Sequence, residues 1–200
     1  MQTGPIVAPA RCRRGQHILI GTHLRLQTPT IGDHHIMYAA ASDSLAQRWL
    51  GWPPEFVVAP DDIDRLLELE PGHGQFVRNP PQHWLLAIDQ SSGMVAGGIA
   101  LDRRSREVGG FLAPAFRGEG LGGELFGAIA TLAHEHLGIA SIRAGTESAN
   151  AASVGALLAA GFSPAHGPDL HQLPDGRQVP STWFQHNAGH TARCRPSRLL

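Results

Sequence analysis

The sequence contains no lysine, only one tyrosine and only two cysteines among its 200 residues. Cys12 and Cys194 lie near opposite ends of the chain, which argues against a disulfide framework and predicts a reduced, cytoplasmic protein. A Walker A loop needs a lysine after its last glycine, so the sequence also argues against an ATPase or GTPase of that type.

Long apolar segments and an excess of charge are missing as well. No apolar run approaches the roughly 20 residues of a membrane-spanning helix, and residues 1–15 lack the apolar core of a secretory signal. The formal net charge is -1 and the isoelectric point is near 6.9. These values give no electrostatic reason to expect binding to nucleic acid or to a membrane surface.

The length fits one domain with a sizeable core. We expect residues 1–16 to form a disordered arm, residues 17–186 the folded domain and residues 187–200 a flexible tail. Apolar periodicity and turn signals predict strands at 23–27, 84–89, 94–101, 107–112, 141–146, 162–166 and 182–185. They predict helices at 30–41 (with its capping segment), 44–50, 61–69, 121–138 and 151–160. This order indicates a single α+β domain.

A glycine-rich turn, residues 117–122 with the sequence RGEGLG, directly follows the predicted strand 107–112 and opens an apolar-periodic helix. The first N–H groups of a helix have no intrahelical partner, and the helix dipole favours negative charge there. Glycine allows the backbone to approach an anion closely because it has no Cβ. The sequence therefore predicts a phosphate-binding site at residues 117–122.

The order of residues within this turn separates two classes of phosphate loop. A dinucleotide-binding fingerprint reads G-x-G-x-x-G, whereas this turn reads R-x-x-G-x-G at Arg117, Gly120 and Gly122. That order resembles the pyrophosphate loop of the GNAT superfamily of acetyl-CoA-dependent N-acetyltransferases. The segment 150–162, with its N-x-x-S…L-L-x-x-G-F pattern, resembles the same family. The segment 107–114 is similar to its ribosomal-protein N-terminal acetyltransferase branch.

This resemblance implies a fold and an activity. The implied fold is a single GNAT-like domain, with a mixed, mostly antiparallel sheet, a splayed central parallel strand pair and flanking helices. The implied reaction transfers the acetyl group of acetyl-CoA to a primary amine by direct attack in a ternary complex. The acceptor is left open between a protein N-terminus and a small amine, and a homodimer is left open too. The alternative is a non-catalytic acyl-CoA-binding module of the same fold.

The resemblance also assigns roles to residues. Glu107 would be the general base, and Ser153 would lie near the sulfur and stabilise the leaving thiolate. The residues expected to bind the cofactor are Phe111, Leu112, Ala113, Arg117, Gly118, Gly120, Leu121, Gly122, Asn150 and Ser153. Each catalytic or polar assignment has a structural alternative: an ordinary strand-end carboxylate for Glu107, a helix N-cap for Asn150, a surface serine for Ser153 and a solvent-facing side chain for Arg117.

Histidine is abundant, with 12 in the chain, but its spacing does not predict a metal. His134 and His136 would point about 200° apart on a helix and cannot readily share an ion, and no Cys/His cluster has zinc spacing. Other GNAT branches often have a tyrosine after their last core helix that serves as general acid. The single tyrosine here, Tyr38, lies in the predicted first helix, so that role is absent or falls to Ser153 or water. The acidic segment 61–70 is either the mouth of a site for a cationic acceptor or a solvated helix face.

Overall fold

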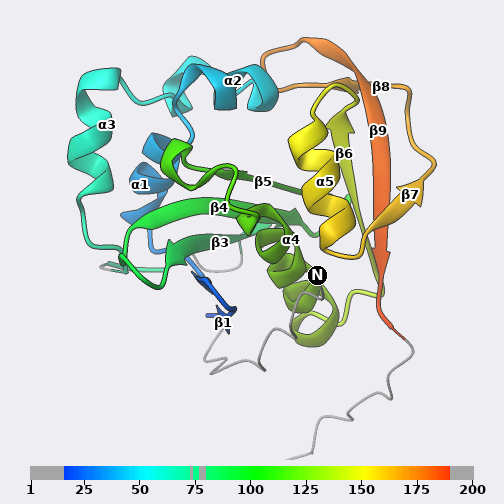
Figure 1. Ribbon diagram of the computed structural model, residues 1–200, viewed down its shortest axis with the longest axis horizontal. Helices are drawn as coiled ribbons and strands as arrows, with labels where there is room; N and C mark the ends of the chain where they lie inside the picture. The colour runs from blue at the N-terminus through cyan, green and yellow to red at the C-terminus, as the bar shows by residue number, and fades with distance from the viewer. Residues whose placement is uncertain (1–15, 73, 77–79, 190–200) are drawn as a thin grey trace, which may run out of the picture.

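The computed structural model describes residues 16–72, 74–76 and 80–189, which form a mixed α+β fold (Figure 1). The strands are β1 (Ile18–Ile20), β2 (Leu24–Gln27), β3 (Gln82–Asp89), β4 (Val95–Asp102), β5 (Val108–Leu112), β6 (Ser141–Glu147), β7 (Ser163–Ala165), β8 (Leu170–Gln172) and β9 (Gln178–Asn187). The helices are α1 (Asp33–Ala40), α2 (Ser44–Leu50), α3 (Pro60–Leu67), α4 (Leu121–Thr131) and α5 (Ala151–Ala159). The predicted arm and most of the predicted tail lie outside the described residues.

The strands form two sheets that meet at one parallel contact. β1 to β5 make an antiparallel sheet in chain order, and β9 pairs antiparallel with β6, β7 and β8. A single parallel bridge between Glu107 and Arg143 joins the two sheets, where the Arg143 N–H donates to the Arg106 carbonyl at 3.0 Å. Beyond this bridge β5 and β6 diverge, which confirms the predicted splayed parallel pair.

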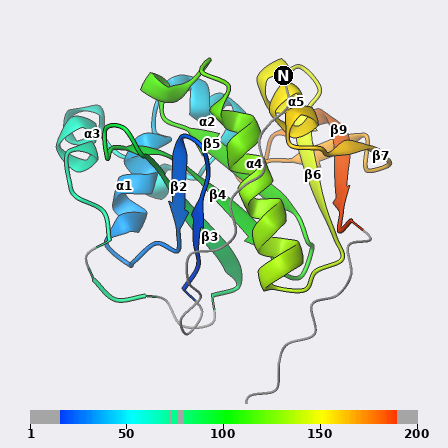
Figure 2. The same cartoon turned by 60° about the horizontal axis from the view of Figure 1, so that its bottom comes forward.

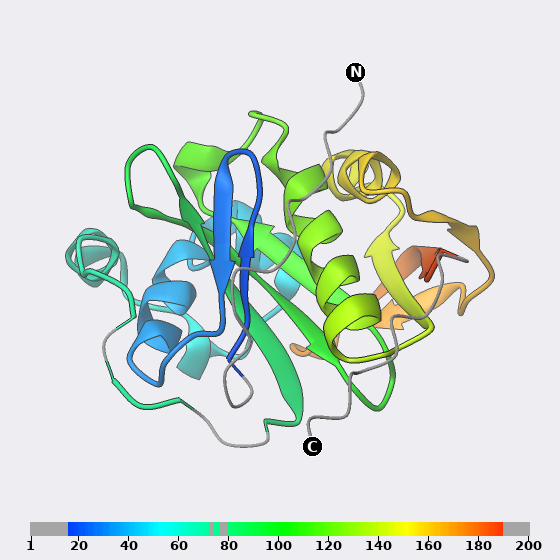
Figure 3. The same cartoon turned by 90° about the horizontal axis from the view of Figure 1, so that it is seen from below.

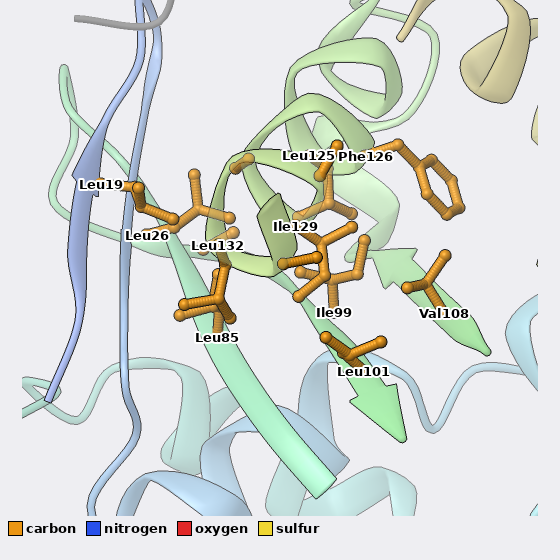
Figure 4. Packing of buried hydrophobic residues seen from close by; sticks show 14 of the residues in the cluster. Leu19, Leu26, Leu85, Ile99, Leu101, Val108, Leu125, Phe126, Ile129 and Leu132 are labelled. Atoms are coloured by element: carbon orange, nitrogen blue, oxygen red, sulfur yellow. The ribbon is translucent and has the colours of Figure 1, made fainter. Parts of the chain in front are cut away.

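Helix α4 fills the space between the two sheets (Figures 2 and 3). Leu125 and Ile129 of α4 pack against Ile99 and Leu101 of β4 in a cluster that excludes water (Figure 4). Because side chains alternate along a strand, the opposite face of the same sheet carries a second core against α1 and α2, which includes Phe111. Buried apolar side chains therefore cover both faces of the β1–β5 sheet beside the gap between β5 and β6.

The sequence-based elements agree closely with the structure, and the differences have local causes. β1 and β8 were not predicted, because each has only three residues and too few alternations to give a strand signal. The predicted helix 121–138 is interrupted. After Thr131 the chain makes a π-helical turn, Leu132–His136, in which the Leu137 N–H donates to the Leu132 carbonyl at 3.0 Å.

Candidate active site

Two cavities meet at the gap between β5 and β6. The first, about 510 Å³, lies at the N-terminal end of α4, between α2 and α5. The second, about 750 Å³, lies along β3 to β6 and extends to the β8–β9 connection. They share the lining residues Trp49, Leu50, Gly110, Phe111, Phe126, Asn150 and Ser153. A ligand in one cavity can therefore contact a ligand in the other at this shared position.

The glycine-rich turn lines the first cavity through Arg117, Gly118, Gly120, Leu121 and Gly122. Gly118 and Gly120 have φ values of 85° and 78°, which side-chain-bearing residues rarely adopt. A Cβ on Gly120 would meet no atom within 4 Å. The turn thus depends on glycine for its backbone conformation, and it presents the N-terminus of the 11-residue helix α4 to open space.

The Arg117 side chain makes three hydrogen bonds within the protein. Its Nη1 and Nη2 donate to the two carboxylate oxygens of Asp43 at 2.9 and 2.6 Å, and its Nε donates to the Leu112 carbonyl at 2.8 Å. The same Asp43 carboxylate caps the N-terminus of α2 by accepting from the N–H groups of Leu45 and Ala46. Arg117 therefore joins the glycine turn, β5 and α2, and its contact with a phosphate stays a prediction.

We expect the Asp43 and Arg117 side chains to be energetically coupled. A double-mutant cycle of Asp43→Ala and Arg117→Ala should give a coupling energy of about 1–2 kcal/mol at pH 7 by denaturant unfolding. The hydrogen bond from Arg117 lowers the pKa of Asp43 below its usual 3.8. The contribution is therefore complete above pH 3.8 and is lost as the pH falls through the lowered pKa. Additive single-mutant effects at pH 7 would contradict this assignment.

The next glycines serve helix packing. A Cβ on Gly122 would lie 2.8 Å from the Cβ of Ala156, and one on Gly123 would lie 3.0 Å from that of Ala159. Both contacts are with α5, so these glycines allow α4 and α5 to approach closely. Gly122 still lines the first cavity through its backbone.

This packing gives a test of stability. We expect Gly122→Leu to lower the free energy of unfolding by about 1–3 kcal/mol, because a larger side chain overpacks the contact with Ala156. Gly155→Leu is the matched control, since a Cβ at Gly155 on α5 meets no atom within 4 Å. Chemical denaturation measures both. An equal loss in the two variants would mean that helix propensity, not the close approach, is responsible.

Glu124, in the first turn of α4, points away from the cavity. Its carboxylate accepts from the backbone N–H groups of His23 and Leu24 at 2.8–3.2 Å, which fastens the β1–β2 turn to the start of α4. A Cβ on Gly21 would overlap this carboxylate. Its negative charge is thus bound by backbone N–H groups of the β1–β2 turn.

The backbone of β5 presents alternate residues to the gap. The Ala113 N–H donates to the Ala96 carbonyl of β4 at 2.9 Å. Because bonded and non-bonded pairs alternate along an antiparallel ladder, the backbone groups of Phe111 also face β4, whereas those of Gly110 and Leu112 face the gap. The backbone groups available to a cofactor in the gap are therefore those of Gly110 and the N–H of Leu112, whereas those of Phe111 and Ala113, which the sequence also suggested, face β4. Phe111 lines both cavities with its ring, and Ala113 is buried.

Asn150 and Ser153 lie where the two cavities meet. The Asn150 side-chain oxygen accepts from the Ser153 N–H at 3.1 Å and caps α5. The predicted capping role is confirmed, and the capping bond holds Ser153 in the first turn of α5 beside the gap.

The second cavity is acidic and aromatic. Asp102, Glu107 and Glu147 line it, and none of its described lining residues is an arginine. Asp102 is fixed in the β4–β5 turn, where the N–H groups of Arg104 and Ser105 donate to it and lower its pKa. Of the other two carboxylates, that of Glu107 forms an ion pair with Arg143, with Oε1 3.9 Å from Nε. The cavity's Trp and Phe lining is Trp49, Trp52, Trp84, Phe111 and Phe126.

Sequence reasoning missed some of these residues and left the place of one acidic cluster open. Glu147 and His171 gave no motif, and only the fold brings them beside Glu107. The acidic segment 61–70 belongs to α3 and its end, and it lines neither cavity. Figure 1 shows α3 at the opposite side of the molecule from α5. This segment is a solvated helix face, in which Arg65 pairs with Asp62 at 2.8 Å.

The histidines pair with one another. His134 Nε2 lies 2.9 Å from His186 Nδ1, and His136 Nδ1 lies 3.0 Å from His17 Nδ1. His134 and His136 thus point to different partners, as their spacing had indicated. Within residues 16–72, 74–76 and 80–189, no group of three or more His, Cys, Asp or Glu side chains could hold a metal ion. No helix in the same residues is long and apolar enough to cross a membrane.

A family model described as "Acetyltransferase (GNAT) domain" matches residues 23–163. The chain belongs to this acetyltransferase family. The match spans both cavities' central residues, from α2 through the glycine turn to α5. No curated protein sequence matches the chain.

Solved structures share the GNAT fold at low sequence identity. Ribosomal-protein-S5-alanine acetyltransferase from Vibrio fischeri has a TM-score of 0.65 at 14% identity, over 85% of this chain and 96% of that one. Spermidine N-acetyltransferase from Vibrio cholerae, in complex with CoA and spermine, has a TM-score of 0.62 at 15% identity, over 82% and 95%. A GCN5-related N-acetyltransferase from Brucella melitensis has 0.63 at 21% identity, over 90% and 81%.

Proposed function

We propose that this GNAT domain transfers the acetyl group of acetyl-CoA to a primary amine by direct attack in a ternary complex. The observation that carries the proposal is the meeting of two cavities at the gap between β5 and β6. Acetyl-CoA would occupy the first cavity and the amine the second. Their reacting atoms would then meet beside Gly110, Asn150 and Ser153, as a ternary mechanism requires.

The first cavity suits the donor. The N–H groups at the start of α4 would bind the pyrophosphate, and the apolar walls from α2 and α5 would cover the pantetheine arm. The backbone groups of Gly110 and the N–H of Leu112 would pair with the amides of that arm, as an added strand does. An N–H from the same edge would also stabilise the oxyanion that forms on the thioester carbonyl.

The second cavity suits an acceptor that arrives as a cation. Its carboxylates attract an ammonium ion, and its tryptophans offer cation–π contacts. Glu107 pairs with Arg143 in the parallel bridge. It precedes Gly110 by three residues along the chain, which places it roughly 10 Å away at about 3.3 Å per residue. At that distance Glu107 would take the proton from the ammonium through a bridging water. Glu147 lies four residues beyond Arg143, level with Phe111, and is the second candidate base.

The transfer then needs no other group. Once the carboxylate has taken the proton, the amine nitrogen attacks the carbonyl carbon and forms a tetrahedral oxyanion. The C–S bond breaks as the oxyanion collapses, and the nitrogen gives up its second proton, which would pass through the Ser153 hydroxyl or a water to the leaving thiolate. Both cysteines lie outside the described residues, near the ends of the chain, so a covalent acetyl-cysteine is not part of the proposal.

Two structural neighbours are named for amine acceptors, spermidine in one and a ribosomal-protein alanine in the other. We keep both a small amine and a protein N-terminus as acceptors at this stage, and we expect a cytoplasmic enzyme that uses acetyl-CoA without a metal. The alternative function is acyl-CoA sensing by the same fold, since the first cavity alone would bind cofactor.

Calorimetric titration with acetyl-CoA, followed by measurement of thiol release with a panel of primary amines, tests the proposal. Binding together with amine-dependent thiol release is the expected result. Binding without release for any amine would favour the sensing module. No binding would overturn the acetyl-CoA assignment itself.

A further inference from the structure

Asp43, the N-cap residue of α2, lies where three parts of the chain around the first cavity meet. Its carboxylate accepts from the Leu45 and Ala46 N–H groups at the start of α2, both at 3.1 Å. The same carboxylate accepts from Nη1 and Nη2 of Arg117, which begins the glycine turn. The Arg117 Nε in turn donates to the Leu112 carbonyl at the end of β5. One carboxylate therefore joins α2, the glycine turn and β5, although Asp43 itself lines neither cavity.

The ion pair between Asp43 and Arg117 has a strong geometry. Two hydrogen bonds, of 2.9 and 2.6 Å, join the guanidinium to both carboxylate oxygens, which is the bidentate arrangement. The two side chains are only 26% and 27% exposed, so water screens the pair only in part. The hydrogen bond from Arg117 is also the largest of the causes that lower the pKa of Asp43 below 3.8. The carboxylate is therefore charged at pH 7.

The glycine turn is held at its two ends. Gly118 and Gly120 bring no side chain to anchor it, and a Cβ at either position would meet no atom within 4 Å. Glycine has the greatest backbone freedom to lose on folding, so such a turn takes its position from the segments on either side. Helix α4 fixes one end. At the other end, the Arg117 side chain ties the turn to Asp43 and to β5.

We infer that Asp43 is a positioning residue for acetyl-CoA, which acts through Arg117 by holding the start of the glycine turn where the amides of the turn and of α4 can bind the pyrophosphate together. This inference rests on the proposed binding of acetyl-CoA in the first cavity. Charge alone assigns Asp43 the opposite effect, because a carboxylate near a pyrophosphate repels it and its removal should tighten binding. Positioning and charge therefore predict changes of opposite sign in the affinity for acetyl-CoA.

Asp43→Asn tests this sign. Asparagine and aspartate are about equally good N-cap residues, so the variant keeps the cap of α2 but loses the charge that pairs with Arg117. We expect the Kd for acetyl-CoA, measured by calorimetry, to rise about tenfold, which is the effect on an equilibrium constant of losing one charge-assisted hydrogen bond. Asp62→Asn is the matched control. It removes the same charge from a hydrogen-bonded ion pair with Arg65 on α3, away from both cavities, and should leave the Kd unchanged.

A double-mutant cycle shows whether Asp43 acts through Arg117. Arg117→Gln removes the guanidinium and leaves Asp43 as the cap of α2. In this background Asp43→Asn should leave the Kd for acetyl-CoA unchanged, because the link to the glycine turn is already broken. A merely structural effect on α2 would be the same in both backgrounds, since it does not need the guanidinium. Thermal unfolding of each variant establishes that the titrations are made on folded protein.

The outcomes are distinct. An unchanged or lower Kd in Asp43→Asn, or a loss of the same size in the Arg117→Gln background, overturns the positioning role while the proposed function stands. Binding that weakens as expected, without thiol release for any amine, supports the positioning role and overturns the transfer reaction. A wild type that does not bind acetyl-CoA overturns the positioning role and the proposed function together.

Discussion

Replacing Gly120 with glutamate is expected to weaken acetyl-CoA binding by at least about 100-fold. The residue lines the first cavity at the turn before α4, and its missing Cβ would point into open space. A carboxylate there would occupy the volume and oppose the charge of the pyrophosphate. Two like unit charges about 4 Å apart repel by about 4 kcal/mol at an effective dielectric constant near 20. Even half of this corresponds to a 30-fold loss, and steric exclusion adds to it. Calorimetric titration with acetyl-CoA measures the effect.

Gly93→Glu is the matched control. Gly93 has a φ of 76°, close to the 78° of Gly120, and a Cβ there also meets no atom within 4 Å. It lies in the turn between β3 and β4 and lines neither cavity. Both variants therefore carry the same backbone strain and the same added charge, but only one carries them into the cavity. Wild-type affinity in Gly120→Glu, or an equal loss in Gly93→Glu, would show that the glycine turn is structural alone.

The parts of the site that lie on one continuous segment could be predicted from sequence. The strand, the glycine turn and the helix occupy residues 107–138. Their sequence signals are local: an apolar strand pattern, closely spaced glycines and helical periodicity. Asn150 and Ser153 came from the resemblance of segment 150–162 to the GNAT family. These residues converge in the structure because the connections between them are short.

What sequence could not show depends on contacts between distant segments. Arg117 forms an ion pair with Asp43, 74 residues away along the chain, so an arginine that the motif assigns to anion binding also joins two distant segments. Glu147 and His171 reach the second cavity only because β6 and β8, which are distant from β5 in the sequence, line the same space. The acidic segment on α3 had a stronger sequence signal than either, yet it lies on a different part of the surface. Charge density along the chain does not specify which charges share a cavity.

The general base provides the second prediction with a large effect. Glu107→Gln should lower kcat by about 100-fold or more, since general base catalysis typically contributes 10²–10⁴-fold. The amide keeps the shape of the side chain but cannot accept a proton from the ammonium. Acetyl-CoA affinity should stay within about twofold of wild type, because Glu107 lines the second cavity and not the first. Steady-state kinetics with saturating n-butylamine, together with calorimetry, separates the two effects.

Glu147→Gln is the comparison that makes this prediction decisive. Glu147 also lines the second cavity, and its neighbour Asn150 ties it to the start of α5 by donating its N–H to the Glu147 carbonyl at 2.8 Å. If Glu107 is the base, Glu147→Gln should change KM for the amine more than kcat, because that carboxylate only attracts the cation. A large loss of kcat in Glu147→Gln alone would assign the base to β6. The amine would then give its proton to Glu147, which lies level with Phe111 of β5, and no water path along β5 would be needed. Raising the pH tests either assignment: the defect should shrink as more of the amine arrives unprotonated, since a neutral amine needs no base before it attacks.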